Sequence, residues 1–274
     1  MIRRHAWLFI LLGLLNVWGL LAPDAAAHPQ EDLEPPPREL RLPVLMYHDI
    51  GATPARYRVT LTALRQQLDW LQEHGYTAVT LRDVHAYMFE GAKLPDLPVV
   101  LTFDDGRSSQ WRVVAELNRR NMRGVFFVMG GAVGLTDEQL RQMVGWGHEV
   151  EAHSMTHPFL TQVSDARLIR EVAGAKQALE SKLGTPIRYF AYPYGDHDDR
   201  VIAAVVAAGY EGGIAAWGSS DWTPAKRWNE PRLEISGLLS LEGFARLVRS
   251  RRMTPSAAYR GPGIGGAMRA GLSA

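Results

Sequence analysis

The stretch "VVLTFDDG", residues 99–106, decides how the rest of the sequence is interpreted. Its apolar residues predict a short strand that is buried on both faces. The strand ends at Asp104 and Asp105, two adjacent carboxylates, and Gly106 follows them. Neighbouring carboxylates repel each other unless their surroundings give them separate roles. We therefore expect this strand tip to carry chemistry.

Apolar runs of strand length alternate with amphipathic segments of helix length. The expected strands lie within residues 42–50, 76–81, 97–103, 124–131, 148–154, 187–195, 211–217 and 232–239. The expected helices lie within residues 61–71, 135–147, 168–183, 200–210 and 240–252. Such alternation predicts parallel strands joined by helical crossovers. About seven or eight strands without a central linker favour one α/β barrel over two separate domains.

The composition is that of a globular protein. Of the 274 residues, 46% are hydrophobic and 22% are charged. The formal net charge of +1 gives no reason to expect nucleic acid as a partner. Because the chain has no cysteine, its fold uses no disulfide and no thiolate metal ligand.

Residues 1–27 have the order of features found in a secretory signal peptide. Arg3 and Arg4 precede an apolar stretch, and small residues follow it at Ala25 and Ala27. An uncleaved membrane anchor is the alternative, but the stretch is short for a span of about 20 residues. We therefore expect a periplasmic or secreted protein that meets the membrane only through this segment.

The remaining boundaries follow from composition. Residues 28–41 are polar and proline-rich, which is typical of a linker. Residues 42–252 hold the alternating pattern and form the expected catalytic domain. Residues 253–274 are rich in glycine and alanine and predict a flexible tail.

Polar clusters stand where the apolar runs end. They are His48-Asp49, Asp104-Asp105, the pair His153 and His157, and the run Tyr192-Pro193-Tyr194-Gly195. In parallel α/β barrels all strand C-termini open on one face, and active sites are built there. Residues far apart in the chain are therefore expected to meet in one bowl.

The segment "HSMTH" places His153 and His157 four residues apart, so that both imidazoles can face one point. Imidazole suits zinc, cobalt or nickel, and one added carboxylate leaves a position open for water. One aspartate of the pair would then bind the cation, and the other would accept a proton. A solvated turn explains Gly106 but leaves the histidines without a role.

The motifs "TFDDG", "HSMTHP" and "FAYPYG", in this order, resemble the first three motifs of the polysaccharide deacetylases. That family is carbohydrate esterase family four, also called the NodB or chitooligosaccharide deacetylase homology domain. The opening strand "PVLMYHDI" is similar to that of many extracellular members, and the resemblance covers roughly residues 42 to 250. It implies a distorted (β/α) barrel, usually with seven strands. It also implies a metal-dependent hydrolase that removes acetyl groups from N-acetylated sugars.

The resemblance also implies roles for individual residues. Asp104 would be the general base, and Asp105, His153 and His157 would bind the metal. Tyr194, which follows Pro193, would offer its backbone N–H to the oxyanion. Ser154 and Pro158 would shape the loop that carries the two histidines.

The sequence departs from the family pattern at two places. Many members have an arginine in the third motif that orients the base, where this chain has Ala191; the nearby Arg188 is expected to face the other side of its strand. Many members also supply the general acid from a late histidine, but no histidine follows His197 here. His48 is our first candidate for that acid, with His197 second; a structural role for His48 is the alternative.

The segment "SSDWTP" resembles the fourth family motif. Asp221 would then be a positioning acid, and Trp222 would form a wall against which a sugar stacks. Trp222 as a packed loop residue is the alternative.

These observations together predict an exported deacetylase that acts on N-acetylglucosamine units and contains zinc, or else cobalt or nickel. Its partner would be an exopolysaccharide, peptidoglycan or a chitin-like polymer. One alternative is a non-catalytic carbohydrate-binding relative, which would not need Asp104. Another is an O-acetyl esterase acting on xylan. A phosphoryl-transfer enzyme is disfavoured, because the sequence lacks a glycine-rich phosphate loop.

Overall fold

The computed structural model describes residues 36–131, 134–217 and 221–251. The strands are β1 (Leu40–Arg41), β2 (Val44–Tyr47), β3 (Asp49–Gly51), β4 (Arg58–Thr60), β5 (Thr77–Val79), β6 (Pro98–Phe103), β7 (Val125–Val128), β8 (Glu149–Ala152), β9 (Tyr189–Ala191), β10 (Gly212–Ile214), β11 (Asp221–Trp222) and β12 (Leu233–Glu234). The α-helices are α1 (Leu61–Glu73), α2 (Leu81–Phe89), α3 (Trp111–Asn118), α4 (Asp137–Gly145), α5 (Asp165–Leu183), α6 (Asp199–Ala207) and α7 (Leu241–Arg249). Short 3-10 helices are η1 (Ser108–Gln110), η2 (Leu160–Gln162), η3 (Pro193–Gly195) and η4 (Pro224–Lys226).

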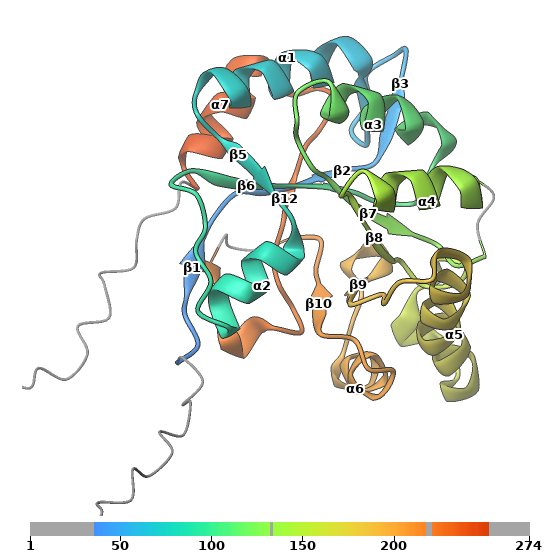
Figure 1. Cartoon of the computed structure of the whole chain (residues 1–274). Coiled ribbons are helices and arrows are strands. Elements are labelled where there is room, and N and C mark those ends of the chain that lie inside the picture. The colour runs from blue at the N-terminus through green and yellow to red at the C-terminus, as the bar shows by residue number, and fades with distance from the viewer. Residues whose placement is uncertain (1–35, 132–133, 218–220, 252–274) are drawn as a thin grey trace, which may run out of the picture. The chain divides into compact units, whose positions relative to one another are not determined.

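The main sheet is parallel and curled. Its strands follow the order β10-β9-β8-β7-β6-β2-β12, and β5 pairs with β6 beside this path. An isolated parallel bridge links Ile214, in β10, to Glu230, which precedes β12 in the chain. The seven-stranded distorted barrel expected from the sequence is therefore confirmed, with helices around the strands (Figure 1).

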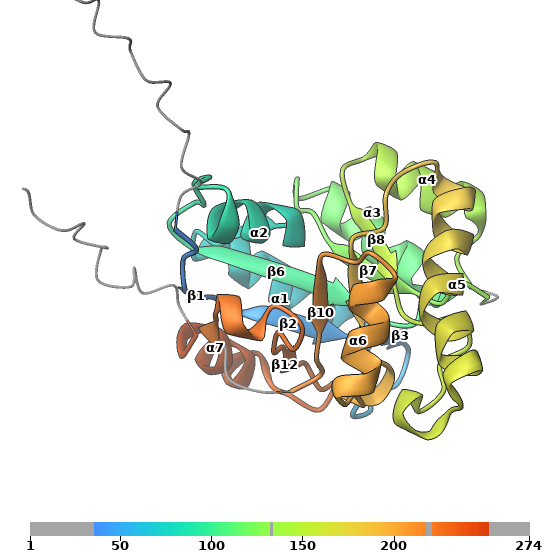
Figure 2. The same cartoon turned by 90° about the horizontal axis from the view of Figure 1, so that it is seen from below.

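The two faces of the curled sheet belong to two apolar cores. Within β6, Val99, Leu101 and Phe103 pack in the larger core, which also contains the buried faces of the helices. Val100, the alternate residue of the same strand, packs in a smaller core with Val44 and Phe127. Alternation of this kind follows from the two-residue period of a strand. Seen from below, α5 and α6 lie side by side along one edge of the sheet (Figure 2).

Local sequence determines where two of the helices begin or end. Thr136 and Gln139 form the capping box that begins α4. Gly184 ends α5 in the left-handed conformation, as a C-terminal glycine does. The last expected strand is shorter than the pattern suggested, because only Leu233 and Glu234 pair with β2.

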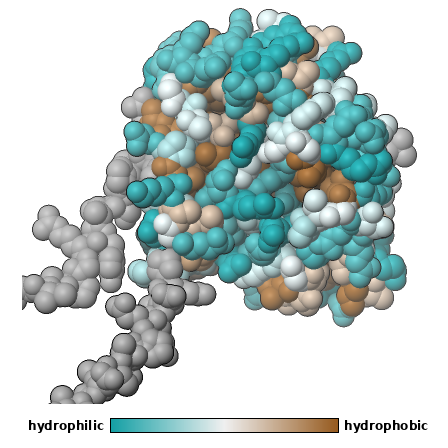
Figure 3. All heavy atoms as spheres, in the orientation of Figure 1, coloured by the Kyte–Doolittle hydropathy of each residue, from teal (hydrophilic) through white to brown (hydrophobic). Residues whose placement is uncertain are grey.

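The described residues include part of the expected linker but neither end of the chain. The segment 1–27 and the tail 253–274 lie outside the described residues. Leu40 and Arg41, expected in the linker, form β1 and pair with β11. Within the described ranges, no helix is long and apolar enough to cross a membrane. The face in Figure 3 is largely hydrophilic, with scattered hydrophobic patches.

Candidate active site

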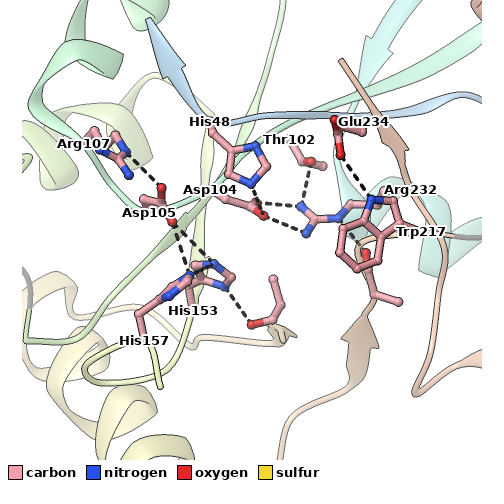
Figure 4. A network of polar contacts seen from close by, with 12 residues as sticks. His48, Thr102, Asp104, Asp105, Arg107, His153, His157, Trp217, Arg232 and Glu234 are labelled. Carbon is pink, nitrogen blue, oxygen red and sulfur yellow. Dashed lines mark hydrogen bonds and ion pairs between the residues drawn. The ribbon is translucent and has the colours of Figure 1, made fainter. Parts of the chain in front are cut away.

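A cavity of about 650 Å³ opens at the C-terminal ends of the strands. Its walls are formed by Met46, His48, Asp49, Ala55, Arg56, Tyr57, Arg58, Asp104, Asp105, Arg107, Met129, His153, His157, Tyr192, Tyr194, Gly195, Ala216 and Trp217. The expectation that distant polar clusters meet in one bowl is therefore met, and Figure 4 shows the central groups.

Backbone strain collects at this cavity. Asp105, Ser154, His157 and Tyr194 all have φ between 59° and 80°, and among the described non-glycine residues only Asn121 shares this conformation. Such conformations cost energy, and they persist where the surrounding structure enforces them. Gly106, with φ of 66°, has no room for a side chain, because a Cβ there would lie 2.7 Å from Val128 Cγ1.

Asp105, His153 and His157 form one compact group of candidate metal ligands. Asp105 Oδ1 lies 3.7 Å from His153 Nε2 and 3.5 Å from His157 Nε2. The two Nε2 atoms are 3.1 Å apart. Ligand atoms around one tetrahedral ion lie roughly 3.4 Å from one another. The three side chains therefore fit a single transition-metal ion.

The surroundings orient these three side chains. His153 Nδ1 contacts the Ala191 carbonyl oxygen at 2.8 Å, and as the donor there it leaves Nε2 free as a ligand. Burial lowers the pKa of His153 to about 4, so the ring is neutral near pH 7. Arg107 Nε donates to Asp105 Oδ2 at 2.9 Å, while Oδ1 faces the histidines. The donor set and its orientation thus both suit a divalent ion.

The histidine loop is held by hydrogen bonds of its own. Ser154 Oγ accepts from the His157 N–H at 2.8 Å, in agreement with the loop-shaping role expected for Ser154. The buried carboxylate of Glu171, from α5, accepts from the N–H groups of Met155 and Thr156 at 3.1 and 2.8 Å. These contacts fix the conformation that turns both imidazoles to one point.

Asp104 lies beside this group but has a different partner. Arg232 Nη1 and Nη2 donate to Asp104 Oδ1 and Oδ2 at 2.7 and 2.8 Å, a fully buried two-point pair. Burial is the largest single effect on the pKa of Asp104 and raises it, but the charge and hydrogen bonds of Arg232, together with His153 and His48, outweigh burial and lower that pKa to about 2. Arg232 is itself held by Thr102 Oγ1 and the Ala215 carbonyl oxygen. Asp104 is thus ionised and fixed in position.

His48 is the histidine that faces Asp104. Its Nε2 lies 4.0 Å from Asp104 Oδ2, and its side chain lines the cavity while partly exposed. Gln110 Nε2 donates to the carbonyl oxygens of both His48 and Asp104, tying the two strand tips together. His197 lies elsewhere, because its Nδ1 contacts the Gly195 carbonyl oxygen and its ring stacks on Tyr192. Of the two acid candidates, only His48 lines the cavity.

The third motif contributes Tyr192, Tyr194 and Gly195 to the cavity wall. Pro193 is buried at the start of η3, and Tyr194 follows with an exposed ring that stacks on Phe159. Gly195 and Asp196 donate their N–H groups within this turn. Among the described residues, none accepts a hydrogen bond from the Tyr194 N–H. Arg188 pairs with Glu211 and does not line the cavity, as its strand position implied.

The prediction for the fourth motif is wrong. Trp222 is fully buried in the smaller core, and its indole N–H donates to the Pro231 carbonyl oxygen. Asp221 pairs with Arg41 between β11 and β1. Neither residue lines the cavity. The physical reason is that this dipeptide forms a strand with β1, which turns the tryptophan inward.

Sequence reasoning missed three residues of the site. Arg232 supplies the guanidinium that the third motif lacks. Trp217 lines the cavity, and Glu234 accepts a hydrogen bond from its indole N–H. Arg232 and Glu234 are alternate residues of one extended segment, so their side chains point to the same side. This alternation was the only feature of the sequence that could have indicated their place near the site.

Comparison with known proteins agrees with this geometry. The sequence model of the family described as Polysaccharide deacetylase matches residues 91–213. The protein YxkH of Bacillus subtilis (strain 168), whose name refers to polysaccharide deacetylase, is 24% identical over 217 residues, which are 77% of each chain. A chitooligosaccharide deacetylase of Bradyrhizobium sp. (strain ANU 289) is 37% identical over 114 residues, 40% of this chain. The chain spans 52% of that relative's length.

Solved structures share the fold. The Streptococcus pyogenes deacetylase PplD, in complex with acetate, superposes with a TM-score of 0.71 at 23% identity, covering 77% of this chain and 99% of that one. The three motifs, the matched segment and the curled parallel sheet together make this chain similar to the polysaccharide deacetylases in sequence and in fold.

Proposed function

We propose that this protein is an exported, metal-dependent deacetylase that hydrolyses the acetamide of N-acetylglucosamine units in a polysaccharide. The observation that carries the proposal is the meeting, in one cavity, of a three-ligand cluster and a separate ionised carboxylate. Asp105, His153 and His157 form the cluster, and Asp104 is held apart from it by Arg232. A carbohydrate-binding relative without activity would need neither the base nor its buried arginine.

In the mechanism, Asp105, His153 and His157 would hold one divalent ion, most simply zinc, with cobalt and nickel as the other ions these ligands suit. When bound, the ion would polarise the acetamide carbonyl and make an attacking water more acidic. Asp104, held ionised by Arg232, accepts the proton of that water. The proton does not pass on to Arg232, which stays charged in proteins.

Two other groups complete the proposed cycle. Tyr194 lines the cavity, and its backbone N–H would donate to the oxyanion that develops from the carbonyl oxygen. An amide nitrogen leaves only after it gains a proton. His48, 4.0 Å from Asp104, is the group proposed to supply that proton.

The test is mass spectrometry of a chitin-type oligomer of N-acetylglucosamine after incubation with the purified protein. Stepwise loss of acetyl groups is expected, as is loss of activity after treatment with a chelator and its recovery with Zn²⁺. Acetylated xylan and peptidoglycan serve as the parallel substrates. Binding of the oligomer without acetyl release would favour a non-catalytic relative, and release from xylan alone would favour an O-acetyl esterase.

Export is proposed from the sequence of residues 1–27. N-terminal sequencing of the protein recovered outside the cytoplasm should begin near His28. A chain that begins at Met1 and remains with the membrane would support the anchor instead.

A further inference from the structure

Trp217 is a large aromatic residue on the wall of the cavity, and its ring is held in place. It follows β10, and 54% of its surface is exposed. Its indole N–H donates to Glu234 Oε2 at 3.2 Å. Single exposed aromatic residues are common on protein surfaces. Trp217 differs from these, because it is anchored by a hydrogen bond at the edge of the catalytic cavity.

The anchor is itself fixed. Arg56 Nε and Nη2 donate to Glu234 Oε1 and Oε2 at 2.9 and 3.1 Å. These hydrogen bonds lower the pKa of Glu234, so the carboxylate that accepts from Trp217 is ionised near neutral pH. Glu234 sits in β12, which pairs with β2 in the main sheet. The indole orientation is therefore set by rigid sheet structure rather than by its own loop.

A ring held in this way suits a sugar. A pyranose has polar edges and an apolar C–H face, and a flat aromatic surface covers such a face. Tryptophan supplies much contact area, and a ring that is already held loses little conformational entropy on binding. An apolar ligand without polar edges would not need the charged residues Arg56 and Glu234 beside the ring.

The position of the ring relative to the reacting groups gives its role. In Figure 4, the metal-ligand cluster, which includes His157, lies on one side of Asp104, and Trp217 lies on the other side. An acetamide that reaches Asp104 and the cluster fills that part of the cavity with its own sugar. The exposed face of Trp217 is then left for a neighbouring sugar of the same chain.

We propose that Trp217 is a sugar-stacking platform for the residue next to the one that is deacetylated, and that Glu234 is its positioning residue. The proposal rests on the proposed function and adds to it the residue that recognises the neighbouring sugar, so that an oligosaccharide is bound more tightly than a single N-acetylglucosamine. Trp217 thereby takes the role that the sequence suggested for the buried Trp222.

The experiment measures kcat and KM for three substrates: an N-acetylglucosamine tetramer, the N-acetylglucosamine monosaccharide and 4-nitrophenyl acetate. Wild-type protein should have a higher kcat/KM for the tetramer than for the monosaccharide. Trp217→Ala should raise KM for the tetramer about 3- to 10-fold, the size of one aromatic contact, with kcat nearly unchanged. Its rates with the monosaccharide and the ester should stay at the wild-type level.

Two further variants separate stacking from anchoring. Trp217→Phe keeps an aromatic face without the N–H, and should lie between wild type and Trp217→Ala. Glu234→Ala should raise KM for the tetramer, whereas Glu234→Gln, which keeps an oxygen acceptor, should restore most of the affinity. The matched control is Trp146→Ala, because Trp146 is 51% exposed but lies outside the cavity. It should leave all three substrates unchanged.

The outcomes are distinguishable. Equal kcat/KM for tetramer and monosaccharide in wild type, or a Trp217→Ala variant with unchanged tetramer KM, would overturn the platform while leaving the deacetylase intact. Equal losses on all three substrates would show that Trp217 only supports the fold. A wild-type protein that releases acetate from no N-acetylated sugar would instead overturn the proposed function.

Discussion

The candidate active site has two halves that are built in different ways. In the metal half, Asp105, His153 and His157 follow strands β6 and β8, and short loops hold them. In the acid–base half, Asp104 depends on Arg232, which lies 128 residues away in the chain. The first half is encoded by local spacing, and the second exists only once the sheet has curled. Substitutions should therefore separate the two halves by what each one destroys.

The largest expected effect is loss of the metal half. His157→Ala removes one of three ligands, so the purified protein should lose most of its metal and nearly all activity. Asp104→Asn, its control on the other half, should keep the metal yet lose activity by about 10²- to 10⁴-fold, as general-base variants do. Elemental analysis and rates measured on the same preparations check both. If Asp104→Asn also strips the metal, the division into halves fails.

The next effect concerns the proton donor. His48→Ala should slow deacetylation of an amide by about 10²- to 10⁴-fold, because the amine leaving group needs a proton. Hydrolysis of 4-nitrophenyl acetate should fall far less, because its phenolate leaves unaided. His197→Ala is the matched control, since His197 stacks on Tyr192 outside the cavity and should leave both rates alone. Equal losses on amide and ester would instead assign His48 a structural role.

The same division explains what the sequence could predict. Asp105, His153 and His157 stand in short motifs at the ends of apolar runs, and the resemblance of these motifs to the family pattern assigned them to the metal half. The barrel was found for a similar reason, because strand and helix periods are local patterns. The local pattern around Arg232, its alternation with Glu234, does not reveal its partner Asp104, which comes from a distant strand.

The sequence also does not indicate which of Trp217 and Trp222 is exposed. Both lie in one short polar stretch, and nothing in their neighbours tells which side chain turns outward. The answer comes from β11, whose pairing with β1 buries Trp222 completely while Trp217 stays half exposed. Burial of a loop residue depends on what packs against it, and the sequence window does not contain that partner.

A smaller effect should follow from replacing Arg232, the arginine that holds Asp104 in the acid–base half. Arg232→Met leaves Asp104 as an unpaired buried carboxylate, so unfolding free energy should fall by about 3–5 kcal/mol. Activity should drop by about 10²-fold through misplacement of the base, with metal content unchanged. Denaturant unfolding and elemental analysis check these. The double variant Arg232→Met/Asp104→Asn removes both charges and should recover part of the stability; an additive loss would contradict the pairing.

The segment that carries Arg232 also reaches below the site. Glu230, Arg232 and Glu234 are alternate residues, so their side chains share one face of an extended strand. Glu234 accepts a hydrogen bond from Trp217, which lines the cavity, whereas Glu230 is fully buried, 3.7 Å from His85 Nε2. Among the described residues, neither carboxylate oxygen of Glu230 has a hydrogen-bond partner. Burial raises the pKa of Glu230 well above 4.5 and lowers that of His85 to about 3.

Glu230→Gln should therefore change stability and its pH dependence, but not activity. The folded protein holds a proton on Glu230 that the unfolded chain releases above about pH 4.5, so this group destabilises the fold as pH rises, by up to about 1.4 kcal/mol per pH unit. Arg227 opposes the shift and His85 stays neutral, so neither reverses the sign. Urea unfolding at about pH 6 and pH 8 should show a smaller loss of stability in Glu230→Gln than in wild type. If the stabilities of wild type and Glu230→Gln depend on pH in the same way, Glu230 is ionised in the folded protein. If Glu230→Gln deacetylates more slowly than wild type, the acid–base half extends below Arg232.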